Sequence, residues 1–547
     1  MKTRVALLVV AVAVVGIVVP QFVSSLNLQN TAVALALAGP AVGTVVALAT
    51  GRPVLVMTAL SGGSAYVSGT VALHHGAVPF AVLAGTAAGG LMGALVALIC
   101  HRLDSPATLV ATLVVTLTGG ALVLALPSVS QQNGVLSGLP PLEVPLGAGR
   151  TLVTTSAGDF HILLVAAAVS IVAGMLVLQA GPGPTWRAIG SDRDRAARTG
   201  LRPITGEAGA MAVAGVISGL SGALAAHVNQ AVSPSDYFAL DVAALPLLAA
   251  FAARRSPLAA GLIAVGTGLV GGVILPGFGW TGPPSATSLA LGALALVTVL
   301  SLLFVGRRGT AKGEPRIDAE APWPIDGLGL RGARLKVAPI QVRARSGEVL
   351  VDAPALTVEP GAVLAVVGPN GAGKTTLFEA LSSSRRRRDG TVVLSGVDSP
   401  RLGVLPQAGG GFANCTVEET LLLAARHGAR RDATAVTSLA LAWSSRLGLG
   451  SARASLCSEL STGQRRLLDL ARVLLGAPNV LLCDEPLAGL DDAHRKAASA
   501  CIRAVAEAGL TVLLTEHDQE AVATLAGSVH ELQRTDTVDA SSAVAVR

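Results

Sequence analysis

The chain has 547 residues, of which 51% are hydrophobic and only 14% are charged. Because soluble domains usually carry about 25% charged residues, this composition excludes a chain that is soluble throughout. The net charge of +6 is modest, and the one basic run, Arg385 to Arg388, is not interleaved with aromatic residues. We therefore expect a solvated loop at that run and no nucleic-acid partner.

The charged residues are distributed unevenly along the chain. Twelve Lys and Arg and eight Asp and Glu precede Gly306, whereas 28 and 26 follow it. We therefore expect a membrane domain over 1–306, a linker over 307–335 and a soluble domain over 336–547. The five cysteines show no paired spacing and four lie in the soluble part, which favours a reducing cytosol over a disulfide framework.

The first part contains apolar stretches long enough to cross a bilayer, since a spanning helix needs about 20 apolar residues. The third stretch is interrupted by Ser61, Gly62, Gly63 and Ser64, which leaves a broken or re-entrant helix open there. In all we predict ten spans, over 5–23, 31–49, 53–73, 77–100, 106–127, 160–180, 207–229, 236–253, 257–276 and 285–305.

The basic residues between these spans predict their orientation. With a cytosolic amino terminus, eleven Lys and Arg lie inside and only Arg150 lies outside, as the positive-inside rule requires. An even number of spans then returns the chain to the cytosol at Arg307. Residues 1–24 also have the pattern of a signal peptide, but no clear cleavage site follows, so we expect an uncleaved first helix.

Glycines recur at helical spacing within two of the predicted spans. Gly85, Gly89 and Gly93 form one set, and Gly215 and Gly219 form another. Small residues let membrane helices approach closely, so we interpret both sets as packing faces.

Three other features of the membrane part are candidates for function. The outside loop 128–159 is rich in Gly, Pro and Ser, and is either a docking surface for an external partner or a plain connection. The centre of the inside loop 181–206, from Trp186 to Thr199, predicts a short surface helix that carries motion between domains. Asp241 is the one acidic residue placed inside a predicted span rather than at its edge, and there it would meet a substrate ammonium group, line a wet path or have a hydrated structural role.

Several stretches of this part resemble the branched-chain amino acid ABC permease family. Residues 133–140 (NGVLSGLP) and 51–66 resemble two family segments, although Met57 stands where the family has a histidine. The resemblance implies a type I-like importer permease, an external solute-binding protein, and a branched-chain amino acid or related small polar solute. The inside loop and the helix after it match the family's coupling loop and next helix at Ala196, Ala197, Gly200, Gly219, Leu220, Gly222, Ala223 and Leu224, with Arg195 in place of an acidic residue.

The soluble part opens with a strand–loop–helix pattern typical of phosphate binding. Residues 363–367 form an apolar strand, and the GPNGAGKT that follows satisfies the P-loop spacing. Glycines are needed because backbone N–H groups must wrap the phosphates. Lys374 would reach the β- and γ-phosphates, and the Thr375 hydroxyl would bind Mg²⁺.

A second apolar strand, 480–483, ends in a pair of acidic residues. Asp484 would help to hold Mg²⁺, and Glu485 would polarise the attacking water. Together with the P-loop, this pattern predicts a nucleotide-bearing α/β sheet with ATP and Mg²⁺ as cofactors, although a P-loop alone fits many ATPases and GTPases.

The ordered set of remaining motifs resembles the ABC ATPase family. Gln407 in VLPQ matches the Q-loop, and residues 460–464 (LSTGQ) match the signature. Asp491 matches the D-loop, and His517 in TEHD matches the switch histidine. The resemblance implies that two ATPase domains form a head-to-tail sandwich, in which the signature of one caps the γ-phosphate held by the P-loop of the other.

The implied site has three sets of residues. The catalytic set is Glu485, His517 and Gln407. The Mg²⁺ set is Thr375, Gln407 and Asp484. The nucleotide-binding set is Gly368, Asn370, Gly371, Gly373, Lys374, Thr375, Thr376, Ser461, Gly463, Gln464 and Asp491.

The family usually stacks adenine on an aromatic residue before the P-loop, and this sequence departs from that pattern. The aligned stretch offers Ala344 or Arg345 and no aromatic residue. Arg345 would stack by a cation–π contact, so we expect weaker affinity or selectivity for the base.

We therefore predict an α-helical polytopic membrane domain followed by an α/β P-loop ABC ATPase. The expected function is ATP-driven solute uptake across the bacterial plasma membrane, with the ATPase in the cytoplasm and a second permease–ATPase half as partner. Two alternatives remain. One is an ABC exporter half, disfavoured by ten spans with short inside loops. The other is a non-transport ABC signalling complex, disfavoured because no large extracellular domain is visible.

Overall fold

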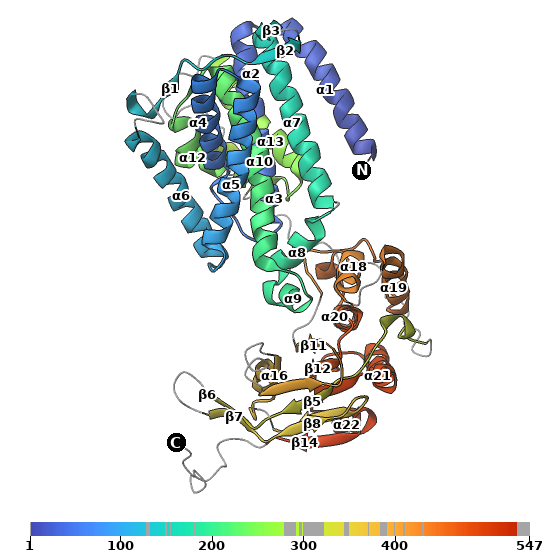
Figure 1. Cartoon of the computed structure of the whole chain (residues 1–547). Coiled ribbons are helices and arrows are strands. Elements are labelled where there is room, and N and C mark those ends of the chain that lie inside the picture. The colour runs from blue at the N-terminus through green and yellow to red at the C-terminus, as the bar shows by residue number, and fades with distance from the viewer. Residues whose placement is uncertain are drawn as a thin grey trace. The chain divides into compact units, whose positions relative to one another are not determined.

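The computed structural model divides into two compact units. The first comprises Met1–Arg193 and Arg202–Arg307, and the second comprises Asp194–Leu201 and Arg308–Arg547 (Figure 1). The domain boundaries at 306 and 336 stay predictions, because 299–321 lie outside the described residues. The described residues are 2–126, 132–147, 150–153, 155–179, 181–277, 292–294, 298, 322–343, 349–369, 371–382, 391–398, 400–407, 411–428 and 432–532.

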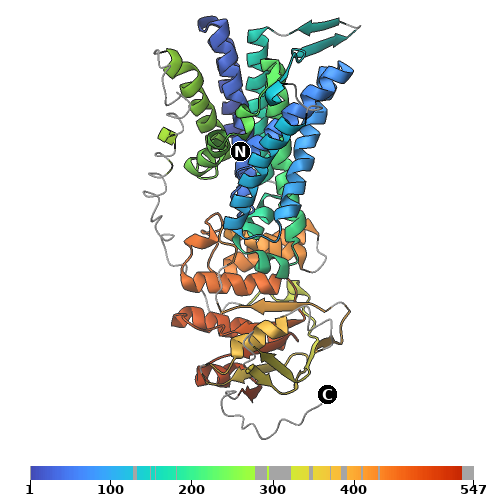
Figure 2. The ribbon, with the colours of Figure 1, turned by 90° about the vertical axis from the view of Figure 1, so that its left-hand side faces the viewer.

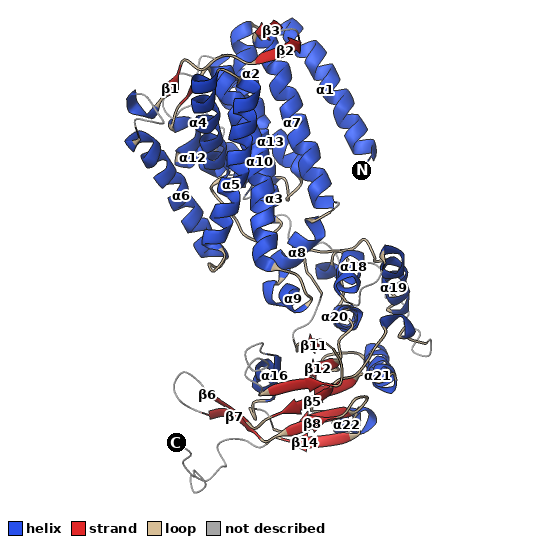
Figure 3. Cartoon of the chain, viewed as in Figure 1, coloured by secondary structure: helices blue, strands red, loops and turns tan. Residues whose placement is uncertain are grey.

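The first unit is helical (Figure 3). Its helices begin where the sequence supplies helix-starting residues: a proline stands in the first turn of α5, α6, α10 and α13, and Asp104 caps α6 by accepting from the Ala107 N–H at 2.9 Å. Its described helices are α1 (Lys2–Phe22), α2 (Ser25–Ala36), α3 (Ala38–Leu48), α4 (Met57–His75), α5 (Val78–Cys100), α6 (Ser105–Ala125), α7 (Ser156–Gln179), α8 (Gly183–Ser191), α10 (Pro203–Asn229), α11 (Ser235–Phe238), α12 (Leu240–Ala252), α13 (Pro257–Leu269), the π-helical turn η2 (Val270–Ile274) and α14 (Leu275–Gly277).

Within the described residues, seven helices are long and apolar enough to cross a membrane, so the count of about ten is not confirmed. The span predicted over 53–73 forms α4, but its Ser, Gly, Thr and His residues leave it too polar to qualify. The span predicted over 5–23 forms α1, of which Val10–Phe22 counts only as a shorter apolar helix. The span predicted over 285–305 lies almost entirely outside the described residues.

The broken or re-entrant helix that the sequence left open at residues 61–64 does not form, because α4 runs without interruption through them. Small residues serve close packing there instead. A Cβ atom added at Gly85 would lie 2.5 Å from the Ser64 carbonyl oxygen, and one added at Gly215 would lie 2.1 Å from the Gly89 carbonyl oxygen. The glycines at helical spacing therefore bring α4, α5 and α10 into backbone contact, as predicted.

Short strands lie at one end of this helical unit (Figures 1 and 2). β2 (Glu143–Gly147) and β3 (Arg150–Val153) form a hairpin within the predicted outside loop. β1 (Leu136–Ser137) pairs with β4 (Ala231–Val232), which joins that loop to the end of α10.

The second unit is built on a parallel sheet with the strand order β11-β12-β13-β9-β14 among the described residues. The central strands β9, β12 and β13 are largely apolar and buried, as expected inside a parallel sheet, whereas the edge strand β14 is mostly exposed. The strands of this sheet are β9 (Val363–Val367), β11 (Leu402–Leu405), β12 (Val480–Asp484), β13 (Thr511–Thr515) and β14 (Ser528–Glu531).

The remaining elements of this unit surround that sheet. β10 (Val392–Ser395), β5 (Arg334–Val337) and β8 (Leu356–Val358) form an antiparallel sheet, and β6 (Ile340–Arg343) pairs with β7 (Val349–Ala353). The described helices are α9 (Arg193–Arg198), α16 (Lys374–Ser382), α18 (Val417–His427), α19 (Ala433–Arg446), α20 (Thr462–Leu475), α21 (Asp492–Glu507) and α22 (Gln519–Leu525).

Candidate nucleotide site

The carboxyl ends of parallel strands meet at one edge of a sheet, which is where α/β proteins bind ligands. In the second unit, β9, β12 and β13 are neighbours in register, and β11 lies beside β12. Lys374 follows β9, Gln407 follows β11, Glu485 follows β12 and His517 follows β13. The topology therefore gathers four predicted site residues at a single edge.

The loop between β9 and α16 has the form of a phosphate cradle. Gly371 and Gly373 both have φ of +85°, a conformation that favours glycine. A Cβ atom at Gly373 would also lie 2.3 Å from Val351 Cγ2. Thr375 and Thr376 follow in the first turn of α16, where backbone N–H groups have no helical acceptor. Asn370 lies outside the described residues.

The Lys374 side chain binds backbone carbonyls of the same loop. Its Nζ atom donates to the Gly368 carbonyl at 2.7 Å and to the Pro369 carbonyl at 3.1 Å. Burial lowers the pKa of the ammonium group, and the nearby Glu485 and Asp484 carboxylates oppose that shift. The side chain is therefore held at the loop, with charge available for an anion.

Glu485 connects the predicted catalytic residues. Its Oε1 atom lies 2.8 Å from His517 Nε2, and its Oε2 atom accepts from Gln407 Nε2 at 2.7 Å. The backbone of Glu485 has φ of +46°, in the left-handed region that a non-glycine residue rarely occupies. The structure thus brings Gln407, Glu485 and His517 into one hydrogen-bonded group.

Asp484 is buried beside this group at the end of β12. Its Oδ1 atom accepts from Thr515 Oγ1 at 2.7 Å, and the same hydroxyl accepts from the Glu485 N–H at 2.9 Å. A carboxylate, the Thr375 hydroxyl and the Gln407 amide oxygen are hard donors that suit Mg²⁺. No group of three or more His, Cys, Asp or Glu residues able to hold a metal occurs in the described part of the chain. These residues therefore fit a metal whose coordination is completed by phosphate and water.

The signature residues lie at the start of α20. Ser461 caps this helix: its Oγ atom accepts from the Gln464 N–H at 3.3 Å, and its own N–H donates to Gln464 Oε1 at 3.0 Å. Gly463 lies against His494, because a Cβ atom there would be 2.7 Å from the ring. Asp491 caps α21 and accepts from His494 N at 3.0 Å and from His494 Nδ1 at 2.6 Å.

The predicted residues therefore fall into two groups. The side-chain hydrogen bonds of Ser461, Gln464 and Asp491 among the described residues run to one another or to His494, and not to Lys374 or Glu485. Ser461 is exposed.

Arg466 is a site-supporting residue that sequence reasoning missed. It is 6% exposed. Its guanidinium donates to the carbonyl oxygens of Asp484 at 2.8 Å and Glu485 at 2.7 Å. It also donates to Gln407 O at 3.0 Å, to Pro486 O at 3.3 Å and to Pro406 O. One buried cation thus joins the end of β11 to the end of β12. The sequence feature that could have identified Arg466 is its position as the second arginine after the signature glutamine, on the face of the helix that points to the core.

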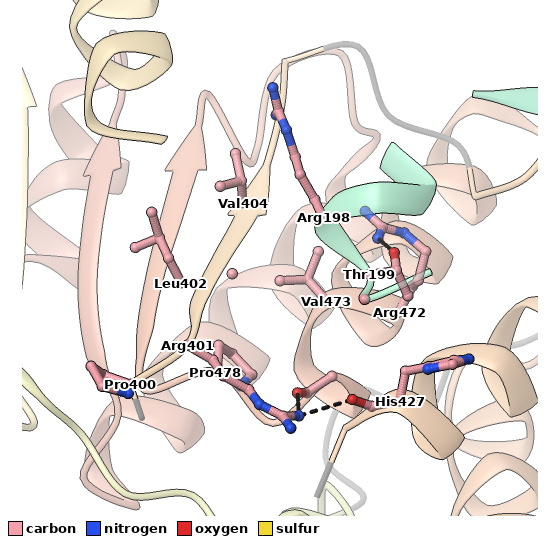
Figure 4. Close-up of a pocket in the computed structure, with 13 residues that line it drawn as sticks. Arg198, Thr199, Pro400, Arg401, Leu402, Val404, His427, Arg472, Val473 and Pro478 are labelled. Atoms are coloured by element: carbon pink, nitrogen blue, oxygen red, sulfur yellow. Dashed lines mark hydrogen bonds between the residues drawn. The ribbon is translucent and has the colours of Figure 1, made fainter. Parts of the chain in front are cut away.

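A separate cavity of about 470 Å³ lies in the second unit, away from these residues (Figure 4). Arg198, Thr199, Arg401, His427 and Arg472 are among its lining residues, and none of the predicted nucleotide residues lines it. Arg472 Nη1 donates to Thr199 Oγ1 at 2.8 Å. The predicted surface helix in the loop 181–206 forms as α8 and α9, and residues 194–201 belong to this second unit.

Two family models match the chain. The model described as branched-chain amino acid transport system / permease component matches residues 25–300, which is about half of the chain. The model described as ABC transporter matches residues 351–488.

Three curated relatives illustrate the range of similar proteins. The hemin import ATP-binding protein HmuV of Myxococcus xanthus is 39% identical over 180 residues, covering 30% of this chain and 67% of that protein. The Nod factor export ATP-binding protein I of Burkholderia thailandensis is 36% identical over 200 residues, covering 34% and 65%. The ABC transporter ATP-binding/permease protein Rv1747 of Mycobacterium tuberculosis is 31% identical over 206 residues, covering 35% and 23%. The chain spans about two thirds of the first two relatives and less than a quarter of the third.

Proposed function

The chain belongs to the branched-chain amino acid transport system permease family and carries an ABC transporter ATPase domain in the same polypeptide, and on that premise we propose that it is one half of an importer. It is a multi-pass membrane protein that hydrolyses ATP. The substrate we propose is a branched-chain amino acid or a related small polar solute. The observation that supports this most is the hydrogen-bonded group of Gln407, Glu485 and His517 in a chain that also contains the permease.

ATP binding begins at the phosphate loop. The backbone N–H groups of Gly371 to Thr376 surround the phosphates, and Lys374 exchanges its contacts with the Gly368 and Pro369 carbonyls for phosphate oxygens. Arg345 would meet the adenine base, but it lies outside the described residues. When bound, Mg²⁺ neutralises charge on the β- and γ-phosphates. Thr375, Asp484 and Gln407 are the residues that would hold it.

Hydrolysis depends on Glu485. Its carboxylate accepts a proton from the attacking water as a general base, and Gln407 and His517 fix its two oxygens. His517 then donates to the γ-phosphate as charge develops there. Positioning and electrostatics account for most of the rate enhancement in phosphoryl transfer, so a group held by the strand ends suits this step.

The working unit is a dimer of ATPase domains. Ser461, Gly463 and Gln464 lie at a helix start that is separate from the Lys374 loop. We infer that they cap the nucleotide held by a second copy of this chain or a related half, and that Asp491 lies at the same interface. A helix N-terminus suits the γ-phosphate because its N–H groups point outward and its dipole favours negative charge.

The remaining assignments concern direction and location. The permease family supports import, whereas the names of the relatives include both import and export. The excess of basic residues on one side of the spans supports a bacterial plasma membrane with the ATPase in the cytoplasm. The segment 128–159, which includes the β2–β3 hairpin, would then face an external solute-binding protein.

Transport into vesicles tests the proposal. The purified chain, with its partner half where the two co-purify, is reconstituted with a candidate solute-binding protein and radiolabelled leucine, and ATP is supplied on the ATPase face. We expect accumulation that requires ATP and the binding protein and is lost in Glu485→Gln. Import is ATP-driven movement of leucine to the side of the membrane that carries the ATPase domain. Movement to the opposite side, or transport that does not depend on the binding protein, would contradict the proposal and favour an exporter.

A further inference from the structure

The first unit contains a cavity of about 570 Å³. This volume lies within the range of about 300–1,000 Å³ that is typical of small-molecule sites. Its wall is drawn from α2, α3, α4, α10, α11, α12, α13 and η2, so the cavity lies among the helices of the permease. Its polar lining residues include Asn30, Thr58, Ser61, Asn229, Asp236 and Asp241.

Two irregular helix segments meet at this cavity. Ala239, which separates α11 (ending at Phe238) from α12 (beginning at Leu240), has an extended backbone with ψ of 147°. α13 passes into the π-helical turn η2, whose glycines line the cavity. Interrupted helices in membrane domains expose polar backbone groups only where they line a cavity, and π-helical turns are frequent at functional sites.

Thr58 provides a second and independent observation. Its side chain lines the cavity and is 2% exposed, yet its Oγ1 atom has no hydrogen-bond partner among the described residues. A buried hydroxyl without a partner is costly, and native structures rarely leave one unexplained. A bound solute with a polar group would satisfy it.

The charge of the cavity is negative. Asp236 and Asp241 line it, and no Lys, Arg or His residue is among its described lining. Asp236 Oδ1 accepts from Ser235 Oγ at 3.3 Å, and Asp241 Oδ1 accepts from the Val242 N–H at 2.9 Å. Neither carboxylate takes part in an ion pair within the described residues. Both side chains are exposed, so a solute can reach them, and ionisable residues within membrane segments mark substrate or ion paths by default.

We propose that this cavity is the solute site of the permease and that it binds a small solute through an ammonium group facing Asp236 and Asp241. Thr58 and the amides of Asn30 and Asn229 hydrogen-bond the rest of the solute. The assignment rests on the proposed transport function and narrows it, because a cavity with two carboxylates and no cation rejects a purely anionic solute. A branched-chain amino acid fits if the amide groups accommodate its carboxylate.

The test introduces a cysteine into the cavity and measures how fast its thiol reacts with charged reagents. Thr267 lines the cavity and is near-isosteric with cysteine, whereas Ala77 is exposed in the loop between α4 and α5 and provides a matched control outside it. The five native cysteines are all buried, so background labelling of the unmodified chain is low. The rates are measured with a trimethylammonium-ethyl and a sulfonato-ethyl methanethiosulfonate on Thr267→Cys and on Ala77→Cys.

We expect the cationic reagent to react at least about tenfold faster than the anionic one at Thr267→Cys, relative to the same ratio at Ala77→Cys, because a charged cleft concentrates counter-ions. Asp236→Asn with Asp241→Asn removes this preference, while Asp236→Glu with Asp241→Glu keeps it. Unchanged labelling of Ala77→Cys in both double variants shows that the fold is retained. An equal preference in the Asn and Glu variants would overturn the proposal.

A matched pair of probes tests the ammonium group directly. At neutral pH, 3-methylbutylamine is a cation and 3-methylbutanol is a neutral molecule of the same shape. We expect the amine alone to slow labelling of Thr267→Cys severalfold, and to lose this effect in the Asn double variant. Protection by neither probe, or equal protection by both, would contradict the proposal. These measurements need no ATP turnover, so failed labelling with intact uptake would refute this site alone, whereas failed uptake with intact labelling would refute the import proposal and leave only a cation-binding cavity.

Discussion

Arg466→Met is the substitution that most directly tests how the ATPase site is held together. Methionine keeps an unbranched apolar side chain, but it is shorter than arginine and has no hydrogen-bond donor. Arg466 contacts five backbone carbonyls at the ends of β11 and β12, and only 6% of its surface is exposed. Water therefore has little access to replace the lost hydrogen bonds.

The expected cost follows from those contacts. A hydrogen bond from a charged donor contributes about 1.5–3 kcal/mol. If two of the five carbonyls stay without a donor, the free energy of unfolding of the ATPase unit falls by about 3–6 kcal/mol. For a unit of this size that corresponds to a melting temperature roughly 10 °C lower.

Hydrolysis should fall more than ATP binding does. The Arg466 side chain holds the carbonyls of Gln407 and Glu485, whose side chains form the catalytic hydrogen bond of 2.7 Å. A misplacement of about 1 Å at a catalytic group costs on the order of 100-fold in rate. The Lys374 loop is a separate contact set, so the Kd for ATP should change little.

Calorimetry, nucleotide binding and phosphate release check these expectations. Arg465→Met is the matched control, because Arg465 is the neighbouring arginine on α20 and its Nε atom has no partner among the described residues. Arg466→Lys should recover part of the stability, since an ammonium group offers three donors. If Arg466→Met behaves like Arg465→Met in both melting and hydrolysis, the reasoning is wrong.

Three other predictions concern charged or ionisable groups. Glu485→Gln should retain ATP binding, lose about 10²–10⁴-fold in phosphate release and trap the closed dimer on a sizing column; unchanged hydrolysis would refute its role as base. Glu207→Ala should destabilise the first unit by about 1.5–3 kcal/mol in detergent melting, because it removes the carboxylate 3.5 Å from Arg52 and leaves that guanidinium only the Cys100 and His101 carbonyls among the described residues; Glu207→Gln should cost less, and an equal cost would argue against a charge effect. Burial raises the pKa of the Cys457 thiol from 9.0 to about 11, so this thiol ionises at lower pH in the unfolded chain than in the folded one. The free energy of unfolding should therefore fall between pH 9 and pH 11, by up to about 1.4 kcal/mol per pH unit. Urea unfolding of Cys457→Ala at both pH values should show a shallower fall.

The grouping of Gln407, Glu485 and His517 follows from sequence because these residues lie in local motifs. The P-loop places Lys374 at the start of a helix whatever surrounds it, and an apolar run ending in acidic residues places Glu485 at a strand end. Parallel pairing then brings Gln407, Glu485 and His517 together, since each follows its strand directly. Arg466 was not predicted, because its five carbonyl partners lie on other elements and the sequence of its own helix does not indicate them.

In the membrane part, too, features of short segments were predictable from sequence, whereas contacts between distant residues were not. Hydropathy identified seven of the spanning helices, and glycine spacing identified the contacts among α4, α5 and α10. The sequence left a break open at residues 61–64, where small residues that would weaken an isolated helix pack instead against neighbouring backbones. Asp241 was noticed, but its partnership with Asp236 and Thr58 around one cavity was not.

The sequence by itself determined that the chain joins apolar helices to an ATPase, because hydrophobic length, charge bias and phosphate-loop spacing are properties of short segments. Only the tertiary structure decided which buried cation holds the strand ends, whether α4 is continuous, and which polar groups share a cavity. Those outcomes depend on contacts between residues distant in the chain, where packing and the cost of unpaired polar groups act.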